Sequence, residues 1–250
     1  MNIQIKTAAE IEYMRKGGKI LADVLEETMK KAVVGVSTWE LDEFAENMIR
    51  QNGGIPAFKG YSGFPATLCT NINEVVVHGI PRKNEFLKEG DLFTIDCGVI
   101  YKGFYTDAAR SKVIGNGPAN KIQMVKTAYE ALSKAIDTAR PGVRLGEISK
   151  AIQTAVESAG FTIVKDLTGH GVGKHLHEEP IILNFFDGDE GPILKPGMTL
   201  AIEPIFAMGK GEINTLKDNW TIVTEDRSCA VQVENTILIT QDGCEILTIK

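Results

Sequence analysis

An internal repeat limits the folds open to this chain more than any other feature of its sequence. Residues 87–96 resemble residues 194–203, with leucine, lysine, glycine, isoleucine and a final carboxylate at matching positions 107 residues apart. The same separation relates residues 35–53 to residues 142–160, where Gly-Val opens and a glycine closes each segment. Chance matching of common turn residues is the alternative, but two separate segments that share one separation favour a duplication.

The duplication predicts an α+β fold of two similar halves, roughly residues 7–112 and 119–240, that pack face to face in a single domain over residues 1–250. Each half is expected to contain two helices and several strands. Both helices of the first half start with a capping box, a hydroxyl followed three residues later by a glutamate. The expected helices cover residues 7–32, 37–53, 120–140 and 145–159. The expected strands cover residues 74–78, 91–100, 104–114, 161–164, 198–206 and 230–240.

Charge and hydropathy argue against two classes of protein. The chain has 27 Lys and Arg residues against 33 Asp and Glu residues, which gives a net charge of −6 and a pI of about 5.4. This acidic balance argues against sequence-independent binding to nucleic acid or to an anionic membrane surface. No apolar run approaches the roughly 18 residues that span a bilayer, the first residues lack a signal pattern, and the four cysteines are scattered. We expect a cytoplasmic protein with reduced thiols.

Two aspartates stand in strand-like runs that are otherwise mostly apolar. Asp96 and Asp107 lie eleven residues apart, on either side of the turn-like residues 101–103. If residues 101–102 form the tip of a hairpin, the two Cβ atoms face each other roughly 5 Å apart; if residues 102–103 form it, the aspartates are diagonal neighbours within about 8 Å. Facing carboxylates repel each other and lose hydration, which a divalent cation would relieve. An edge hairpin with both aspartates in water is the alternative.

Glu203 and Glu234 repeat this pattern, because each lies within an apolar, strand-like run. Three of the four histidines fall within the glycine-rich residues 169–177, although spacing alone does not show that His170 and His177 converge. A solvent-facing position is the alternative for each of these residues taken alone. Four carboxylates and an imidazole suit a hard or borderline divalent metal such as Mn, Co, Fe or Zn. Five ligands exceed the needs of one zinc ion and favour a pair of metals about 3.5–4 Å apart.

These residues, in this order, resemble the methionine aminopeptidases of the first type, in their short bacterial form. The similarity extends from the helix start at Ser37 to Glu234. Its most specific segments are Asn71–Pro81, Thr168–Gly173, His177–Pro180 and Ala201–Pro204. The resemblance implies the pita-bread fold, an α+β fold of two pseudosymmetric halves with an antiparallel sheet and outer helices, which agrees with the repeat. The second type of the family carries an insertion between its last two ligand glutamates, for which the 31 positions from Glu203 to Glu234 leave no room.

The resemblance also implies roles for individual residues. The metal ligands would be Asp96, Asp107, His170, Glu203 and Glu234, with Asp107 and Glu234 bridging two divalent ions. Catalytic roles would belong to His78, His177 and Glu203, and both of these histidines would contact the substrate. The pocket for the methionine side chain would consist of Tyr61, Phe64, Cys69, Leu176 and Trp220, with Phe58 at its rim. The chain departs from the common bacterial pattern at Phe58, Leu176 and Lys174-His175, where Cys, Phe and Arg-Gly are more familiar, and we expect His175 to be exposed.

The activity implied is removal of the initiator methionine from nascent proteins whose second residue is small. The expected partners are nascent polypeptide N-termini, met at the ribosome by a monomer that binds no membrane and no specific nucleic acid sequence. One alternative is another pita-bread metallopeptidase, of the type that cleaves Xaa-Pro bonds and usually carries a large additional N-terminal domain. The other alternative is a non-catalytic pita-bread binding protein, although such relatives lose ligands that this sequence keeps.

Overall fold

The computed structural model describes residues 3–250 and contains the four predicted helices. They are α1 (Ala8–Lys31), α2 (Thr38–Gln51), α3 (Ala119–Thr138) and α4 (Leu145–Ser158). Both predicted capping boxes are present: the hydroxyl oxygens of Thr7 and Ser37 accept hydrogen bonds from the third residue of each helix, whose glutamate carboxylate bonds back to the cap N–H. These caps satisfy N–H groups that the first turn leaves without partners, which is why the helices begin where they do.

The strands form two larger sheets and two small ones. In the first half, β4 (Leu92–Tyr101) pairs with β5 (Phe104–Val113), β2 (Leu68–Ile72) and β1 (Ile55–Pro56). The larger sheet of the second half has the order β15 (Cys244–Ile246), β14 (Asn235–Ile239), β9 (Thr199–Ile202), β7 (Thr168–Gly171), β8 (Glu178–Leu183). The small sheets consist of β13 (Ala230–Gln232), β10 (Ile205–Ala207) and β6 (Thr162–Ile163), and of β11 (Ile213–Thr215), β12 (Ile222–Thr224) and β3 (Val75–Val77). A short 3₁₀ turn covers Tyr61–Gly63. All pairings among the described strands are antiparallel.

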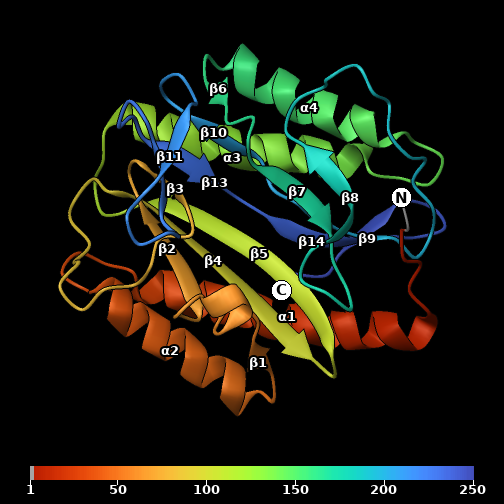
Figure 1. Cartoon of the computed structure of the whole chain (residues 1–250), viewed down its shortest axis with the longest axis horizontal. Coiled ribbons are helices and arrows are strands. Elements are labelled where there is room, and N and C mark those ends of the chain that lie inside the picture. The colour runs from red at the N-terminus through yellow and green to blue at the C-terminus, as the bar shows by residue number, and fades with distance from the viewer. Residues whose placement is uncertain (1–2) are drawn as a thin grey trace.

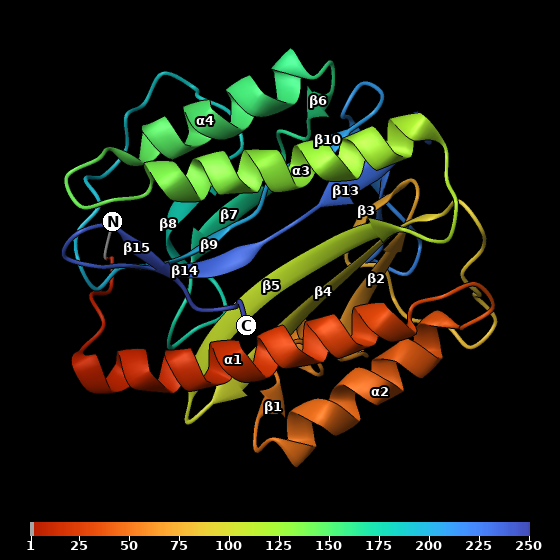
Figure 2. The same ribbon diagram turned by 180° about the vertical axis from the view of Figure 1, so that it is seen from behind.

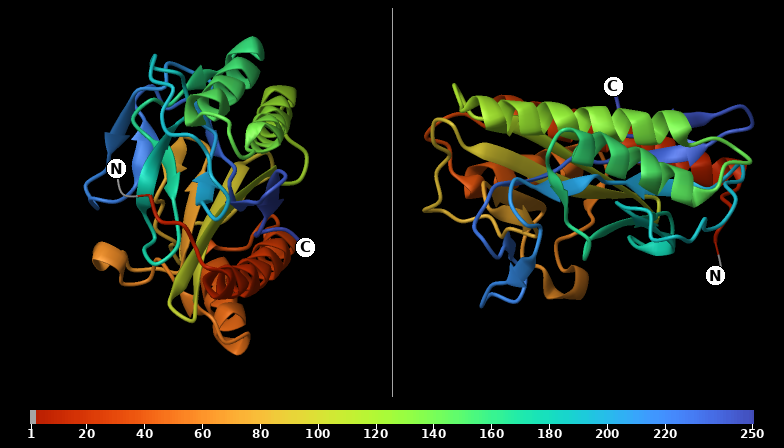
Figure 3. Two further views of the ribbon diagram at one scale, coloured as in Figure 1. Left: turned by 90° about the vertical axis from the view of Figure 1, so that its right-hand side faces the viewer. Right: turned by 90° about the horizontal axis from the view of Figure 1, so that it is seen from above.

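The helices cover one side of the strands (Figure 1), with α1 and α2 over one half and α3 and α4 over the other (Figure 2). The edge-on views in Figure 3 show the strands and their loops on the other side of this helical layer. Each half buries its own apolar core between helices and strands, the first around Phe93 and the second around Phe206. Because helices cover one side of the strands, the opposite side is left for the loops and for a site between the halves.

The repeat read from the sequence is present in the structure with the same separation. α2 and α4 start and end 107 residues apart, as do β1 and β6. The pairing registers repeat as well, because Pro56 opposite Val99 corresponds to Ile163 opposite Phe206. Asp96 therefore occupies in β4 the place that Glu203 occupies directly after β9.

Two of the predicted strands are interrupted. The expected strand 198–206 divides into β9 and β10 at Glu203-Pro204, where proline has no N–H to donate to a neighbouring strand. The expected strand 230–240 divides into β13 and β14. The break occurs because the N–H of Glu234 donates to the carbonyl of Ala109 in β5 and not to a neighbouring strand of the sheet that contains β13 or β14. Both interruptions lie where the halves meet, and both place a carboxylate there. The sequence did not predict the remaining strands, which are β1, β2, β7, β8, β11, β12 and β15.

No helix within residues 3–250 has the length and apolar composition required to cross a bilayer.

Candidate metal centre

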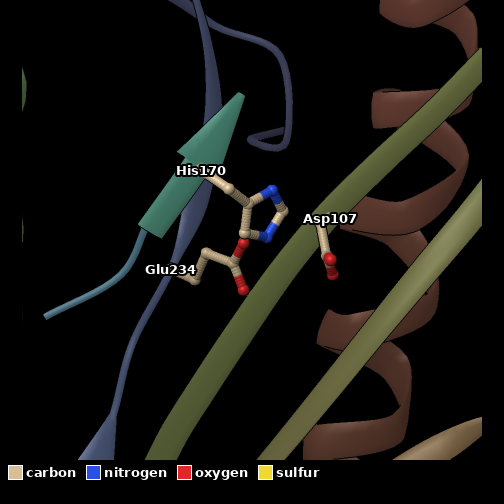
Figure 4. A group of neighbouring side chains, drawn as sticks. All are labelled: Asp107, His170 and Glu234. Carbon is tan, nitrogen blue, oxygen red and sulfur yellow. The ribbon is translucent and has the colours of Figure 1, made fainter. Parts of the chain in front are cut away.

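Five side chains from both halves meet between the sheets. Asp96 and Asp107 come from β4 and β5, and His170 comes from β7. Glu203 and Glu234 come from the two strand interruptions. Ligand atoms of Asp107, His170 and Glu234 all lie within 4.8 Å of one another (Figure 4). Nε2 of His170 lies 3.6 Å from a carboxylate oxygen of Glu203.

The register of the β4–β5 hairpin brings the two aspartates together. Tyr101 pairs with Phe104, so Lys102 and Gly103 form the tip, and both have positive φ. Asp96 is opposite Ala109 and Asp107 is opposite Gly98, which makes the aspartates diagonal neighbours on one face and selects the second of the two predicted registers.

The strand β14 holds the backbone of Asp107 in place. The N–H of Asp107 donates to Thr236 Oγ1 at 2.9 Å, and the hydroxyl of Thr236 donates to the carbonyl of Asp107 at 2.8 Å. Arg110 joins the same two strands, because its guanidinium donates to the main-chain carbonyl of Glu234 at 2.6 Å. The carboxylates of Asp107 and Glu234 are thus carried by backbones that are bonded to each other.

Gln232 is a member of this cluster that the sequence did not single out. Its side-chain amide nitrogen donates to a carboxylate oxygen of Glu203 at 3.0 Å and of Asp96 at 3.3 Å. The only signal in the sequence was an amide in the apolar run Ala230–Val233. The amide links the two carboxylates that the internal repeat makes equivalent.

Burial dominates the electrostatics of the cluster. All four carboxylates are buried, Glu234 to 1% exposure. Burial raises the pKa of Asp96 to about 7, and it raises the pKa values of Asp107, Glu203 and Glu234 well above their usual range, helped by the negative charge of neighbouring carboxylates. Burial, with a contribution from His177, lowers the pKa of His170 to about 4, which keeps this imidazole neutral near pH 7.

The residues present fit a divalent cation. Buried oxygens of Asp96, Asp107 and Glu234 have no hydrogen-bond partner, and among the described residues no Lys or Arg forms an ion pair with any carboxylate of the cluster. His170 Nδ1 lies 2.8 Å from the carbonyl of Gly171, to which it donates, so that Nε2 presents its lone pair to the carboxylates. Buried carboxylates with free acceptor oxygens are neutralised by protons or by a cation, and carboxylate with imidazole suits Mn, Co, Fe or Zn.

The raised pKa values make a prediction about stability. Between about pH 4 and about pH 7, the four carboxylates of the folded protein without metal hold protons that the unfolded chain has released. They therefore lower the free energy of unfolding as pH rises through this window, against the opposite contribution of His170, whose pKa is lowered to about 4. For Asp96 alone, a pKa raised from 3.8 to about 7 corresponds to a loss on the order of 4 kcal/mol. We expect chelator-treated protein to show a lower urea midpoint at about pH 8 than at about pH 5, and bound Mn²⁺ to reverse this loss.

The control for this prediction is Asp96→Asn, which removes one of the titrating groups and should make the dependence on pH shallower. Equal urea midpoints of the chelated protein at both pH values would contradict the prediction.

The four carboxylates and His170 line a cavity of about 550 Å³. The residues predicted to hold a methionine side chain all line it: Phe58, Tyr61, Phe64, Cys69, Leu176 and Trp220. Most of them belong to one apolar cluster. In this cluster the rings of Phe64 and Trp220 pack edge to face, with their centroids 5.1 Å apart. Asp166, Thr168, Glu179 and Ile181 also line the cavity and were not predicted.

His78 and His177 also line the cavity. His78 has a φ of +58° directly after β3, and its ring meets that of Trp220 edge to face. The ring centroids of His177 and His170 are 4.5 Å apart, and Nδ1 of His177 is 3.1 Å from the hydroxyl of Tyr61. Burial lowers the pKa of both histidines. His175 is exposed, as predicted.

Comparisons with known proteins agree with this geometry. The model of metallopeptidase family M24 matches residues 12–241. A methionine aminopeptidase of Clostridium acetobutylicum is 46% identical over 247 residues, which are 99% of each chain. The crystal structure of a methionine aminopeptidase from Thermotoga maritima superposes with a TM-score of 0.98 and 43% identity, covering 100% of both chains.

The fold is also similar to that of a more distant protein. A prolidase from Pyrococcus furiosus has a TM-score of 0.80 and 25% identity, and the match covers 98% of this chain but 65% of the prolidase. The predicted pita-bread α+β fold is confirmed by these likenesses.

Proposed function

The chain belongs to metallopeptidase family M24, and on this premise we propose that it is a methionine aminopeptidase, a hydrolase that removes the initiator methionine from newly made proteins. Its substrates are the N-termini of nascent polypeptides in which the second residue is small. Contact with the ribosome and a monomeric state stay predictions.

One observation carries this proposal: a single cavity joins a buried acidic cluster to an apolar pocket. The acidic end attracts the positively charged amine of a free N-terminus, and the apolar end, formed by Phe64, Leu176 and Trp220, accepts an unbranched hydrophobic side chain such as methionine. A peptide bound with its amine at the acidic cluster and its first side chain in the apolar pocket would lie in the same cavity as His78 and His177, which supports roles for both histidines at the first peptide bond. A chain without a free amine has nothing to bind at the acidic end, which restricts cleavage to the terminal bond.

The five clustered residues are proposed to hold two divalent ions. By the resemblance to this family, Asp107 and Glu234 would be shared by the two ions, and Asp96, His170 and Glu203 would complete the ligand set. Divalent ions supply Lewis-acid chemistry, which makes water a stronger nucleophile at neutral pH.

Glu203 is proposed to move the proton. Its carboxylate would take a proton from the attacking water and hold it until the leaving amine accepts it. Gln232 donates to the other side of this carboxylate and fixes its orientation.

His177 is proposed to stabilise negative charge on the scissile carbonyl oxygen. If the hydroxyl of Tyr61 donates to Nδ1, the neutral imidazole carries its proton on Nε2, which is then free to donate to the substrate. His78 lines the same cavity and is proposed to assist, and its lowered pKa keeps it neutral near pH 7. A neutral imidazole can donate a hydrogen bond to the oxyanion, and it does not repel the bound amine of the substrate.

The test of the function is release of methionine from the peptide Met-Ala-Ser. We expect no release by chelated protein and restored release when Mn²⁺, Co²⁺, Fe²⁺ or Zn²⁺ is added in turn, with stoichiometric metal found by elemental analysis. N-acetylated Met-Ala-Ser is the control and should resist cleavage. Preferential cleavage of Xaa-Pro peptides would favour the prolidase alternative, and a protein with neither metal nor peptidase activity would be a binding protein.

A further inference from the structure

A buried ion pair ties the start of the chain to the loop that carries His177. Nζ of Lys6 lies 2.5 Å from Oε2 of Glu178, and the two side chains are only 4% and 5% exposed. The pair joins positions 172 residues apart. Lysine and glutamate are rarely buried this far unless each neutralises the other.

Glu178 uses its second oxygen to shape the same loop. Oε1 accepts the N–H of His175 at 3.0 Å, so the two oxygens of one carboxylate join the ammonium group of Lys6 to the backbone of residues 173–178, which we call the His177 loop. The N–H of Gly173 donates to the carbonyl of His175 and its carbonyl accepts the N–H of Tyr105, which closes the loop at its base. The carboxylate thus joins Lys6 to the loop that carries Leu176 and His177 on the wall of the cavity.

The lysine is packed closely as well as paired. A Cβ atom at Gly173 would lie 2.2 Å from Cε of Lys6, so the loop can approach the lysine this closely only because residue 173 is glycine. The main chain of Lys6 is itself anchored, because its N–H donates to the carbonyl of Gly197 at 2.9 Å. The lysine therefore supports the His177 loop from a fixed backbone.

We propose that Lys6 is a positioning residue for catalysis: through Glu178 it sets the place of the His177 loop and hence of the His177 ring in the cavity. The inference rests on the proposed function, in which His177 donates to the reacting carbonyl. Without Lys6, Glu178 becomes a buried, unpaired carboxylate that must move toward water, and the N–H of His175 loses its acceptor. A displacement of His177 by about 1 Å is enough to cost up to about 100-fold in rate.

The experiment is a double-mutant cycle with Lys6→Met, Glu178→Gln and both changes together. Each single change should lower kcat by about 10- to 100-fold with KM little altered. The reason is that a displaced His177 ring loses its hydrogen bond to the reacting carbonyl, which forms in the transition state. The double variant buries no charge and keeps an amide oxygen for His175, so it should recover most of kcat. Lys174→Met is the matched control, since Lys174 lies in the same loop, is 65% exposed and pairs weakly with Glu10 at 3.5 Å.

Hydrogen exchange supplies a readout that needs no turnover. The amide of His175 should exchange faster in Lys6→Met, return to wild-type protection in the double variant and stay unchanged in Lys174→Met. Unchanged kcat and exchange in a folded Lys6→Met protein would overturn the proposal. If that variant does not fold, a double variant whose kcat and exchange fail to recover would overturn it instead. Failure of wild-type protein to release methionine would refute the proposed function, while the exchange cycle would still test the link from Lys6 to the loop.

Discussion

Replacing Glu203 with glutamine is expected to remove almost all methionine release from Met-Ala-Ser. The change keeps the shape of the side chain but removes its charge and its capacity to take a proton. Loss of a general base costs about 10²- to 10⁴-fold in rate, and loss of a carboxylate from the cluster weakens metal binding in addition. Glu203 is buried beside His170 and Gln232, so both losses occur at a single side chain within the cluster.

Metal titration separates the two roles of Glu203. If it acts only as a ligand, excess metal should restore turnover to Glu203→Gln; if it also carries the proton, the loaded variant should remain inactive. The matched control is Glu225→Gln, an exposed glutamate near the end of β12, which should leave both metal content and turnover unchanged. Wild-type kcat in Glu203→Gln at any metal concentration would remove the residue from the mechanism.

The helices and the repeat could be predicted because their signals are local. The capping boxes at Thr7 and Ser37 determine where α1 and α2 begin, and each one involves only residues close together in the sequence. The repeat needed only a comparison of the chain with itself, and that comparison was enough to place Asp96 and Glu203 in equivalent positions. Isolated carboxylates in apolar strands were also visible, because burial of an unpaired charge is costly.

The hairpin register could not be chosen from the sequence. The turn at Lys102-Gly103 has positive φ at both residues, at 53° and 83°, as in a type I′ turn. Asparagine or aspartate before the glycine would have indicated this turn, whereas lysine gives no such signal. The convergence of His170 with Glu234 was likewise hidden, because it depends on the order of β14, β9 and β7 in a sheet assembled from distant segments.

Gln232 and Lys6 were missed for the same physical reason. An amide within an apolar strand and a lysine before a helix are ordinary residues until the fold supplies their partners, which are Asp96 and Glu203 for one and Glu178 for the other. The sequence identified residues whose type is unusual among their neighbours in the chain, such as carboxylates in apolar strands. It did not find those that become unusual only through contacts between distant parts of the chain.

Replacing His177 with alanine is expected to leave the metal content intact while kcat falls by about 10²- to 10³-fold. The proposed hydrogen bond from Nε2 forms as negative charge develops on the scissile carbonyl, and one such donor contributes about 2.7–4 kcal/mol to transition-state stabilisation. KM should change little, because the side-chain pocket and the acidic cluster remain.

His175→Ala is the matched control, since it removes an exposed imidazole two positions away in the same loop. Tyr61→Phe tests the orientation of the ring, because it removes the hydroxyl 3.1 Å from Nδ1 while keeping the aromatic wall of the cavity. It should lower kcat by a smaller factor than His177→Ala and add little when combined with it, since a hydroxyl that acts through the imidazole has no effect once the imidazole is gone. Full turnover in His177→Ala, or additive losses in the double variant, would show that the ring and its hydroxyl partner do not act together on the substrate.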